Sequence, residues 1–376
     1  MAPEAAARAV LRGRLVLDER VAPGRLHVED GLLVGLELDE AERGGPLLAP
    51  GFVDVHVHGW GGHDAMGGRA ALDGMARALL RQGVTSFLPT AVTAPMDALR
   101  RFADEVREWL PAAPADGAQP LGFNLEGPFL ARERKGAHDE RHLRLPSDVP
   151  TAELQPLLPG LRVITVAPEL PGAPELISWL DERGVAVSAG HSAAVLDEAR
   201  AGYAAGARST THLFNAMTGV DHRAPGLAVA ALTRDEAYTE LIADGHHVHP
   251  ALWPIITRSK PPDRLLLVSD AIALAGSGQA RGVVGGLEVE VVEGRVTLAG
   301  SGVLAGSLIA LDSAVANLVR EGLPLAYAAA AASRNPLALL NLRDRGRLDT
   351  GLRADIVELD DELRVQRVMR AGEWLT

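Results

Sequence analysis

The 376-residue sequence contains no cysteine, and this absence rules out two structural devices. No disulfide bond can form and no thiolate can ligate a metal ion, so histidine and carboxylate side chains are the ligands that remain. Aromatic residues are also scarce, at 4% of the sequence, although hydrophobic residues make up 47%. We therefore expect a core built mainly of leucine, valine, isoleucine and alanine, in one large domain with a smaller companion.

Positive charge is in deficit as well. The chain has 37 lysine and arginine residues against 49 aspartate and glutamate residues, which gives a net charge of −12. This balance opposes non-specific binding to nucleic acid or to an acidic membrane. No apolar run approaches the roughly 18 residues of a membrane span, and the first residues lack the features of a secretory signal. The sequence thus predicts a soluble cytoplasmic protein without nucleic-acid or membrane partners.

The two ends of the chain have the same pattern. Residues 8–50 alternate short apolar runs with turns such as Glu29-Asp30-Gly31, and residues 354–374 contain similar runs. Short runs joined by a tight Asp-Gly turn are typical of antiparallel strands. We expect residues 1–50 and 341–376 to form one small β-sandwich domain, with residues 51–340 inserted between them as a separate unit.

The inserted unit contains eight apolar runs, most of them separated by stretches of helical character such as 70–82 and 95–110. The runs cover residues 53–58, 85–89, 121–126, 163–167, 185–191, 209–212, 241–244 and 265–270. Strands that alternate with helices favour parallel β/α units, and a TIM barrel has eight strands. The predicted fold class is therefore α/β, a (β/α)8 TIM-like barrel, with a hairpin at 287–298 inserted after the last strand.

Metal-capable side chains close several of these runs. His56 and His58 are two residues apart on one strand, a spacing that points both imidazoles to the same face. Glu126, His191 and His212 end three other runs, and the carboxyl ends of barrel strands meet at one face. Taken singly, each would be read as a structural histidine or a solvated glutamate. Together they predict a metal site with an open position for water, in which Glu126 ligates one ion or bridges two.

Further polar residues that follow the strands indicate acid–base and binding roles. Asp270 closes the eighth run and could take a proton from a metal-bound water, although aspartate is also a preferred helix N-cap. His138 could donate to a carbonyl oxygen, and Asn215, Arg223 and His247 could bind an oxygen-rich or phosphorylated substrate. Considered singly, each of these last four is better explained as a surface residue.

These residues stand in segments that resemble one known family. In order along residues 50–310, the chain contains Pro-Gly-Phe-Val-Asp-Val-His-Val-His-Gly, Leu-Glu-Gly-Pro-Phe, Lys-Gly-Ala-His, Thr-His-Leu-Phe-Asn-Ala-Met, Ala-Asp-Gly-His-His-Val and Val-Ser-Asp-Ala. They are similar to segments of the N-acetylglucosamine-6-phosphate deacetylases, metal-dependent barrels of the amidohydrolase superfamily. The resemblance implies a set of roles: metal ligands Glu126, His191 and His212, catalytic aspartate Asp270, and carbonyl-polarising histidine His138.

The same resemblance implies the substrate contacts, the partner and the ion. It assigns the sugar phosphate to residues of three loops: Asn215, Ala216, Arg223, His247, Leu304, Ala305, Gly306 and Ser307. In that family some phosphate contacts come from the neighbouring subunit, so we expect a homodimer. Members that keep the histidine pair of the first strand, here His56 and His58, can hold two ions, whereas others hold one. Zinc is the expected ion, with iron, cobalt and manganese as alternatives.

The resemblance implies metal-dependent hydrolysis of N-acetylglucosamine 6-phosphate to glucosamine 6-phosphate and acetate. Two alternatives remain open: a deacetylase of another acetylated amino sugar, and a non-catalytic member that binds the sugar phosphate. A silent member would be expected to have lost a ligand or the acid, and none is missing. Cyclic-imide and dihydroorotate hydrolases commonly use a bridging carboxylated lysine, which the run 163–167 lacks, because Lys135 and Lys260 lie outside the expected strands.

Overall fold

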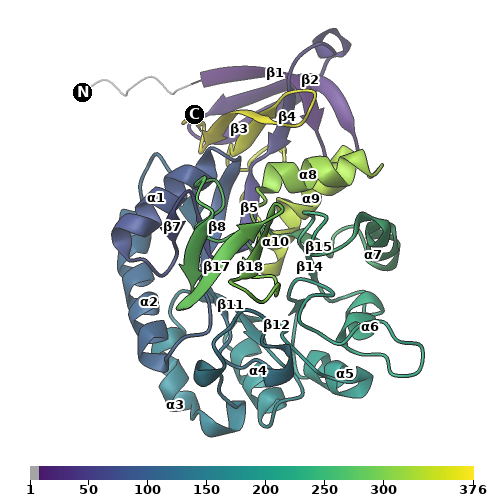
Figure 1. Ribbon diagram of the computed structural model, residues 1–376. Coiled ribbons are helices and arrows are strands. Elements are labelled where there is room, and N and C mark those ends of the chain that lie inside the picture. Colours follow the sequence, from purple (N-terminus) through teal and green to yellow (C-terminus); the bar gives the residue numbers. More distant parts are fainter. Residues whose placement is uncertain (1–7) are drawn as a thin grey trace.

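The two ends of the chain meet in one sheet, at the top of Figure 1. The computed structural model describes residues 8–376, and within them this sheet has seven strands in the order β21-β20-β19-β4-β1-β2-β3. Their bounds are β1 (Arg8–Val16), β2 (Val21–Glu29), β3 (Leu32–Leu38), β4 (Leu47–Pro50), β19 (Ile356–Leu359), β20 (Val365–Arg370) and β21 (Glu373–Trp374). Neighbours pair antiparallel, except that β1 and β4 run parallel. Residues 1–7, on which the prediction of no secretory signal rests, lie outside the described part of the chain.

This sheet has a core of its own. Strand β2 buries every second residue, and its Leu26 packs with Leu15 of β1. From the other end of the chain, β19 adds Ile356, which is fully buried in the same cluster. The turn between β2 and β3 holds Asp30 and Gly31 at φ values of 51° and 80°, a conformation that an Asp-Gly pair adopts readily. The antiparallel strands and the Asp30-Gly31 turn that the sequence predicts are therefore present.

A sheet of parallel strands forms the middle of the molecule (Figure 1). Its order is β13-β12-β11-β10-β8-β5, with the short β9 beside β8, while β14 pairs separately with β15. The bounds are β5 (Phe52–Val57), β8 (Val84–Ala91), β9 (Gln119–Pro120), β10 (Phe123–Glu126), β11 (Leu161–Val166), β12 (Ala186–Ala189), β13 (Ser209–Thr210), β14 (Thr239–Leu241) and β15 (Leu265–Leu267). Strands β5 and β8 are buried along their whole length, as expected of a parallel sheet covered on both faces.

Backbone hydrogen bonds connect the β14–β15 pair to both edges of this sheet. Thr210 N donates to Tyr238 O over 3.0 Å beside β13, and Asp270 N donates to His56 O over 2.9 Å beside β5. The parallel sheet is therefore curled, and its carboxyl ends face a common centre. The seventh run was placed too late by the sequence analysis, because β14 precedes the predicted 241–244 almost entirely.

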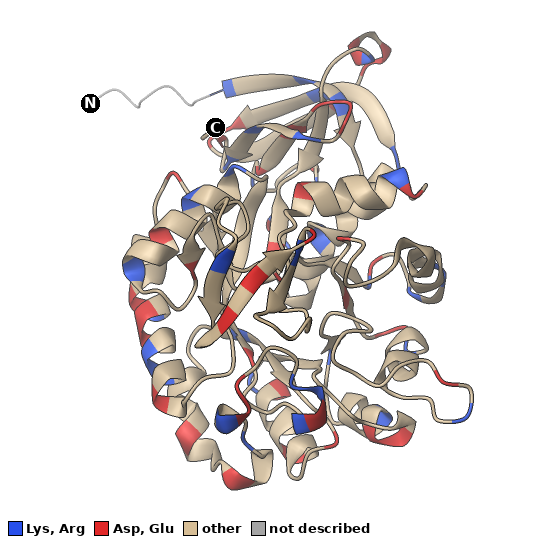
Figure 2. Ribbon diagram, in the orientation of Figure 1, with Lys and Arg blue, Asp and Glu red and all other residues tan. Residues whose placement is uncertain are grey.

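Helices cover the outside of the curled sheet (Figure 1). Their bounds are α1 (Arg69–Leu80), α2 (Met96–Trp109), α3 (Thr151–Leu154), α4 (Ala173–Asp181), α5 (Leu196–Ala204), α6 (Leu227–Leu232), α7 (Trp253–Ser259), α8 (Leu311–Arg320), α9 (Leu325–Ala331) and α10 (Arg334–Leu339). Helix α2 buries Leu99, Phe102 and Val106, at spacings of three and four residues that place them on one face. Figure 2 shows acidic and basic residues interspersed along α1 and α2. The predicted helices at 70–82 and 95–110 correspond to α1 and α2.

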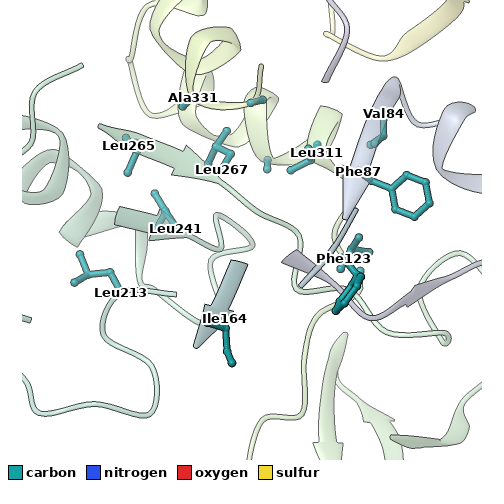
Figure 3. Close-up of a cluster of buried hydrophobic side chains, with 14 of the residues drawn as sticks. Val84, Phe87, Phe123, Ile164, Leu213, Leu241, Leu265, Leu267, Leu311 and Ala331 are labelled. Carbon is teal, nitrogen blue, oxygen red and sulfur yellow. The ribbon is translucent and has the colours of Figure 1, made fainter. Parts of the chain in front are cut away.

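Aliphatic side chains dominate the core around the parallel strands (Figure 3). Leu241 of β14 and Leu267 of β15 are fully buried, as are Phe87 of β8 and Phe123 of β10. Phe102 of α2 meets Phe123 edge-on, with ring centroids 5.6 Å apart. The few aromatic residues thus fill large gaps in a core that is otherwise aliphatic.

A small antiparallel sheet is inserted after β15 and lies in front of the central strands in Figure 1. It consists of β16 (Arg281–Val284), β17 (Leu287–Val292) and β18 (Arg295–Leu298). The predicted hairpin at 287–298 corresponds to β17 and β18, whereas β16 was missed because its short run is interrupted by Gly282 and largely exposed. A hairpin of β6 (Gly59–Trp60) and β7 (His63–Asp64) follows β5. Within residues 8–376, no helix combines the length and the apolar character needed to cross a membrane.

Candidate metal centre

The five predicted metal ligands lie at the carboxyl ends of central strands. His56 belongs to β5, His58 follows it directly, and Glu126 is the last residue of β10. His191 and His212 come two residues after β12 and β13, with φ values of 35° and 25°. Left-handed backbone is costly for residues other than glycine and clusters at functional sites. Each strand therefore ends in a turn that directs a ligand side chain toward the common centre.

Glu126, His191 and His212 form a compact first group. Glu126 Oε1 is 3.0 Å from His191 Nε2 and 2.9 Å from His212 Nε2, and the two nitrogens are 3.1 Å apart. Zinc bonds of about 2.0–2.1 Å in a tetrahedron place neighbouring ligand atoms about 3.3 Å apart. The three buried side chains thus have the spacing needed to share one ion.

Glu126 also belongs to a second group with His56, His58 and Asp270. The Nε2 atom of His58 is 3.2 Å from Glu126 Oε2 and 3.1 Å from Asp270 Oδ1. The Nε2 atom of His56 is 3.5 Å from Glu126 Oε1 and 3.6 Å from Asp270 Oδ1, and it makes no hydrogen bond. A buried nitrogen without a partner, facing carboxylate oxygens, suits a cation ligand. One carboxylate is therefore shared between two groups that could each hold an ion.

Hydrogen bonds behind the imidazoles decide which ring nitrogen faces the centre. The Nδ1 atom of His58 lies 3.0 Å from Thr90 O, and the Nδ1 atom of His191 lies 2.8 Å from Arg134 O. Because a carbonyl oxygen only accepts, each Nδ1 carries a proton, and when the ring is neutral its Nε2 has a lone pair directed at the centre. This is the tautomer that a metal ligand needs.

Burial and neighbouring charges together determine which side chains of the centre are protonated. Burial alone would raise the pKa of Glu126, but the nearby histidines hold this pKa well below its ordinary value. Burial also opposes ionisation of Asp270, yet the hydrogen bond from His58 and the charge of His56 lower the pKa of Asp270 to about 2. Burial lowers the pKa of His191 to about 4. Near pH 7 both carboxylates are therefore ionised and His191 is neutral, the states required for metal binding. Although burial opposes it, the hydrogen bonds to Asp270 and Glu126 raise the pKa of His58 to about 9, so a metal ion would have to displace a proton from this ring.

His138 presents an N–H group at the edge of the first ligand group. The Thr93 N–H donates to its Nδ1 atom over 3.2 Å, so the neutral ring carries its proton on Nε2. That Nε2 is 3.1 Å from Glu126 Oε2. Gly127, at φ 96°, permits the close packing, because a Cβ atom there would lie 2.2 Å from Thr93 Oγ1. His138 can thus donate a hydrogen bond to a substrate atom next to the metal ligands.

The ligand groups open into a cavity of about 340 Å³. Six of the predicted substrate residues line it: Asn215, Ala216, His247, Leu304, Ala305 and Gly306. Val284 of β16 also lines it, so the inserted sheet forms part of the wall. Ser307 is buried behind this wall instead, where its hydroxyl donates to Ser269 O over 2.5 Å. Arg223 is exposed on the loop between β13 and α6, outside the cavity of its own chain.

Two lining side chains are held in place by neighbours. The Nδ1 atom of His247 lies 2.7 Å from Asp244 Oδ2, which leaves Nε2 available to a ligand. Although burial opposes it, the hydrogen bond from His247 lowers the pKa of Asp244. Asn215 Nδ2 is 3.2 Å from His212 O and 3.2 Å from Leu213 O, so its amide oxygen remains free to accept. The cavity wall therefore offers both an acceptor and an imidazole to a polar ligand.

Sequence analysis missed two buried carboxylates beside the ligands. Glu240 of β14 has its Oε2 atom 3.0 Å from His56 Nδ1 and 3.1 Å from His212 N. Asp54 of β5 has its Oδ1 atom 3.2 Å from His56 N. The sequence did contain a signal for both residues. Each is an acidic residue within an apolar strand, and a buried carboxylate there requires a hydrogen-bond or charge partner.

The curled parallel sheet carries a buried centre in which one carboxylate is shared by two histidine groups, and residues 47–375 match the model of the Amidohydrolase family. The chain belongs to the amidohydrolase family, as the resemblance implied. It is 39% identical to the N-acetylgalactosamine-6-phosphate deacetylase of Escherichia coli O157:H7, over 97% of this chain and 98% of the other. It is 38% identical to the human N-acetylglucosamine-6-phosphate deacetylase, over 96% of this chain and 90% of the other.

Solved structures show the same similarity. The N-acetylglucosamine-6-phosphate deacetylase of Thermotoga maritima matches with a TM-score of 0.91 at 33% identity, covering 98% of this chain and 99% of the other. A mutant of the Mycobacterium smegmatis enzyme, in complex with N-acetyl-D-glucosamine-6-phosphate, matches with a TM-score of 0.90 at 33% identity, covering 98% and 100%. The similarity therefore extends over nearly the whole chain.

Proposed function

We propose that this chain hydrolyses the N-acetyl group of N-acetylglucosamine 6-phosphate, which yields glucosamine 6-phosphate and acetate. The observation that carries the proposal is the position of Glu126, a single carboxylate shared by two histidine groups at the cavity. Asp270 and His138 lie beside it, where an acid–base group and a hydrogen-bond donor are needed. Similarity over nearly the full length to sugar-phosphate deacetylases supports the same conclusion.

The residues present fit a divalent metal. Glu126, His191 and His212 would hold one ion, and His56 and His58 would hold a second, with Glu126 shared between the two groups. When bound, such an ion polarises a carbonyl group and lowers the pKa of a coordinated water to about 7. Zinc is the first candidate because it favours imidazole and carboxylate ligands at tetrahedral spacing, and iron, cobalt or manganese are alternatives.

Asp270 would act first as a general base and then as a general acid. Its ionised carboxylate takes a proton as the water oxygen forms a bond to the acetyl carbonyl carbon. His138 donates its Nε2–H to the carbonyl oxygen as negative charge develops there, a contribution of about 3 kcal/mol. Asp270 then gives the proton to the sugar nitrogen while the C–N bond breaks. Acetate and a free amine are the products.

We place the sugar phosphate against the loop that follows His212, with its anionic end near Asn215, Ala216 and His247. When its ring is protonated, His247 can donate from Nε2 to a phosphate oxygen, and the free amide oxygen of Asn215 can accept from a hydroxyl group. The sugar ring would lie against the wall formed by Leu304, Ala305 and Gly306, and Ser307 would support this wall from behind.

We propose that Arg223 reaches the cavity of a second subunit in a homodimer. Its side chain is exposed on a loop and lies outside the cavity of its own chain. A planar guanidinium suits the oxygen cluster of a phosphate group, and it would attract an anionic substrate to a protein of net charge −12.

We further propose that residues 51–340 form a (β/α)8 barrel and that residues 1–50 and 341–376 form one small β-sandwich domain. The hydrogen bonds from β13 to the β14 region and from the end of β15 to β5 support the barrel. The seven-stranded sheet shared by both chain ends supports the small domain. A cytoplasmic location is proposed from composition alone.

N-acetylgalactosamine 6-phosphate is a second candidate substrate, because the relatives named for the two sugars are 39% and 38% identical to this chain. The test compares acetate release from both phosphorylated sugars and from unphosphorylated N-acetylglucosamine, at equal concentration with metal-replete protein. We expect rapid turnover of the phosphorylated sugars only, with the glucosamine form preferred. Preference for the galactosamine form would select the second candidate, and absence of release from all three would refute the proposal.

A further inference from the structure

We infer that Glu240 is a positioning residue of the metal centre, which fixes the ring of His56 and the turn at His212. The inference rests on the proposed function for the presence of metal ions, but it does not depend on which amide is hydrolysed. Glu240 touches ligands only from behind and does not line the cavity. Its role would therefore be to orient the groups that hold the ions.

The burial of Glu240 inside strand β14 indicates a positioning role. Glu240 is the central residue of β14, has no exposed surface, and pairs with Leu266 of the neighbouring strand β15. A charged carboxylate in an apolar interior costs several kcal/mol unless donors compensate it. An apolar side chain at this position would pack without that cost. The presence of a glutamate is therefore explained by the groups that it contacts.

The first contact orients His56. The Nδ1 atom of His56 lies 3.0 Å from Glu240 Oε2, across a sequence separation of 184 residues. A carboxylate accepts, so Nδ1 holds the proton and the lone pair of Nε2 faces Glu126 and Asp270. That Nε2 has no hydrogen-bond partner in the described part of the chain. Without Glu240, the ring could rotate or move its proton to Nε2, and either change would remove a ligand of the second group.

The second contact stabilises the turn that carries His212. The same Oε2 atom accepts from His212 N over 3.1 Å, and the backbone carbonyl of Glu240 accepts from Leu213 N over 2.9 Å. His212 has a φ of 25°, a conformation that must be held by its surroundings. One carboxylate oxygen thus joins a ligand of the second metal group to a ligand of the first.

The second carboxylate oxygen of Glu240, Oε1, allows a comparison of two substitutions, to glutamine and to leucine. Glu240 Oε1 is buried and has no hydrogen-bond partner among residues 8–376. Glutamine can therefore keep both hydrogen bonds with its carbonyl oxygen while its amide group takes the unpartnered position. Leucine keeps most of the volume but offers no acceptor. Thr239→Val is a matched control, because Thr239 is the preceding residue of β14, is equally buried, and has a hydroxyl without a partner.

The test is a zinc titration of chelator-treated protein by calorimetry, with ions per chain counted by elemental analysis. We compare the wild type with Glu240→Leu, Glu240→Gln and Thr239→Val. We expect two ions per chain in the wild type and the Thr239 control. In Glu240→Leu, affinity for the ion of the His56 group should fall about 10- to 100-fold, as expected when the partner of a metal-bound histidine is lost. Glu240→Gln should bind zinc close to wild type, and kcat should follow metal content across the series while KM changes little.

Three results would overturn the inference: unchanged affinity in Glu240→Leu, equal weakening in Glu240→Gln and Glu240→Leu, or a single ion per wild-type chain. If Glu240→Leu fails to fold, imidazole ¹⁵N spectra of the zinc-loaded wild type decide the question. A proton on Nδ1 of His56 supports the inference, and a proton on Nε2 overturns it. A wild type that binds two ions but releases no acetate would refute the proposed function and leave this inference standing.

Discussion

Replacing Asp270 by asparagine should remove most of the turnover and leave the fold and the first ion in place. Asparagine has nearly the same shape but cannot take up and return a proton near neutral pH. Asp270 belongs to the ligand group of His56 and His58 and not to the group of His191 and His212. The ion held by the latter group should therefore remain bound in the variant.

The size of the effect follows from the two roles of this carboxylate. General acid–base catalysis contributes about 10²- to 10⁴-fold, which corresponds to about 3–5 kcal/mol of activation free energy. We expect the upper part of this range, because Asp270 serves in both proton transfers and is only 7% exposed, which limits replacement by bulk water or buffer. KM should change little, since the proposed phosphate contacts come from other loops.

The assay is acetate release from N-acetylglucosamine 6-phosphate, with metal content measured on the same samples. Asp116→Asn is a suitable control, because Asp116 forms an exposed ion pair with Arg77, of a kind that contributes little. If Asp270→Asn retained activity within tenfold of the wild type at equal metal content, the proton would be transferred by another group. The proposed mechanism would then be wrong.

Four other perturbations test separate parts of the account. Glu126→Gln should lose both ions in metal analysis and several kcal/mol of transition-state stabilisation, since Glu126 belongs to both ligand groups. Retention of both ions would contradict the shared-ligand geometry. Mixing Arg223→Ala with Asp270→Asn should restore activity that neither variant has alone, because the hybrid dimer contains one complete site; no restoration after subunit exchange would place Arg223 outside that role. Burial raises the pKa of Tyr203 to about 12, so the native state keeps this proton longer than the unfolded state, whose pKa is about 10. The free energy of unfolding should therefore fall by about 2 kcal/mol as pH rises from 10 to 12, and urea titrations of Tyr203→Phe should lack this component. Leu267→Ala should lower the free energy of unfolding by about 2–5 kcal/mol, measured in urea, because Leu267 is fully buried between strands and helices.

The ligand positions were predictable because they are encoded locally. The two-residue spacing of His56 and His58 follows from strand geometry alone, and Glu126 is marked by an apolar run that stops at Gly-Pro. The seventh strand was misplaced for a physical reason. Asp244 has the pattern of a strand-ending ligand, but its carboxylate binds His247, and the strand itself ends at Leu241.

The rest of the site depends on contacts between distant segments, which no local pattern reveals. Glu240 and His56 are 184 residues apart, and only the curled arrangement of strands brings them together. Ser307 looks like a lining residue from its place beside Gly306, but its hydroxyl donates to Ser269 O. The proposed role of Arg223 would have a similar cause, because its exposed loop would act only through another subunit.

The most direct test of the central claim is acetate release by chelator-treated protein as zinc is added back. The account predicts no turnover of N-acetylglucosamine 6-phosphate without metal, and activity that rises with the number of ions bound per chain. Full activity in protein shown by elemental analysis to be free of metal would contradict it, because the buried His–carboxylate groups would then have no part in the reaction.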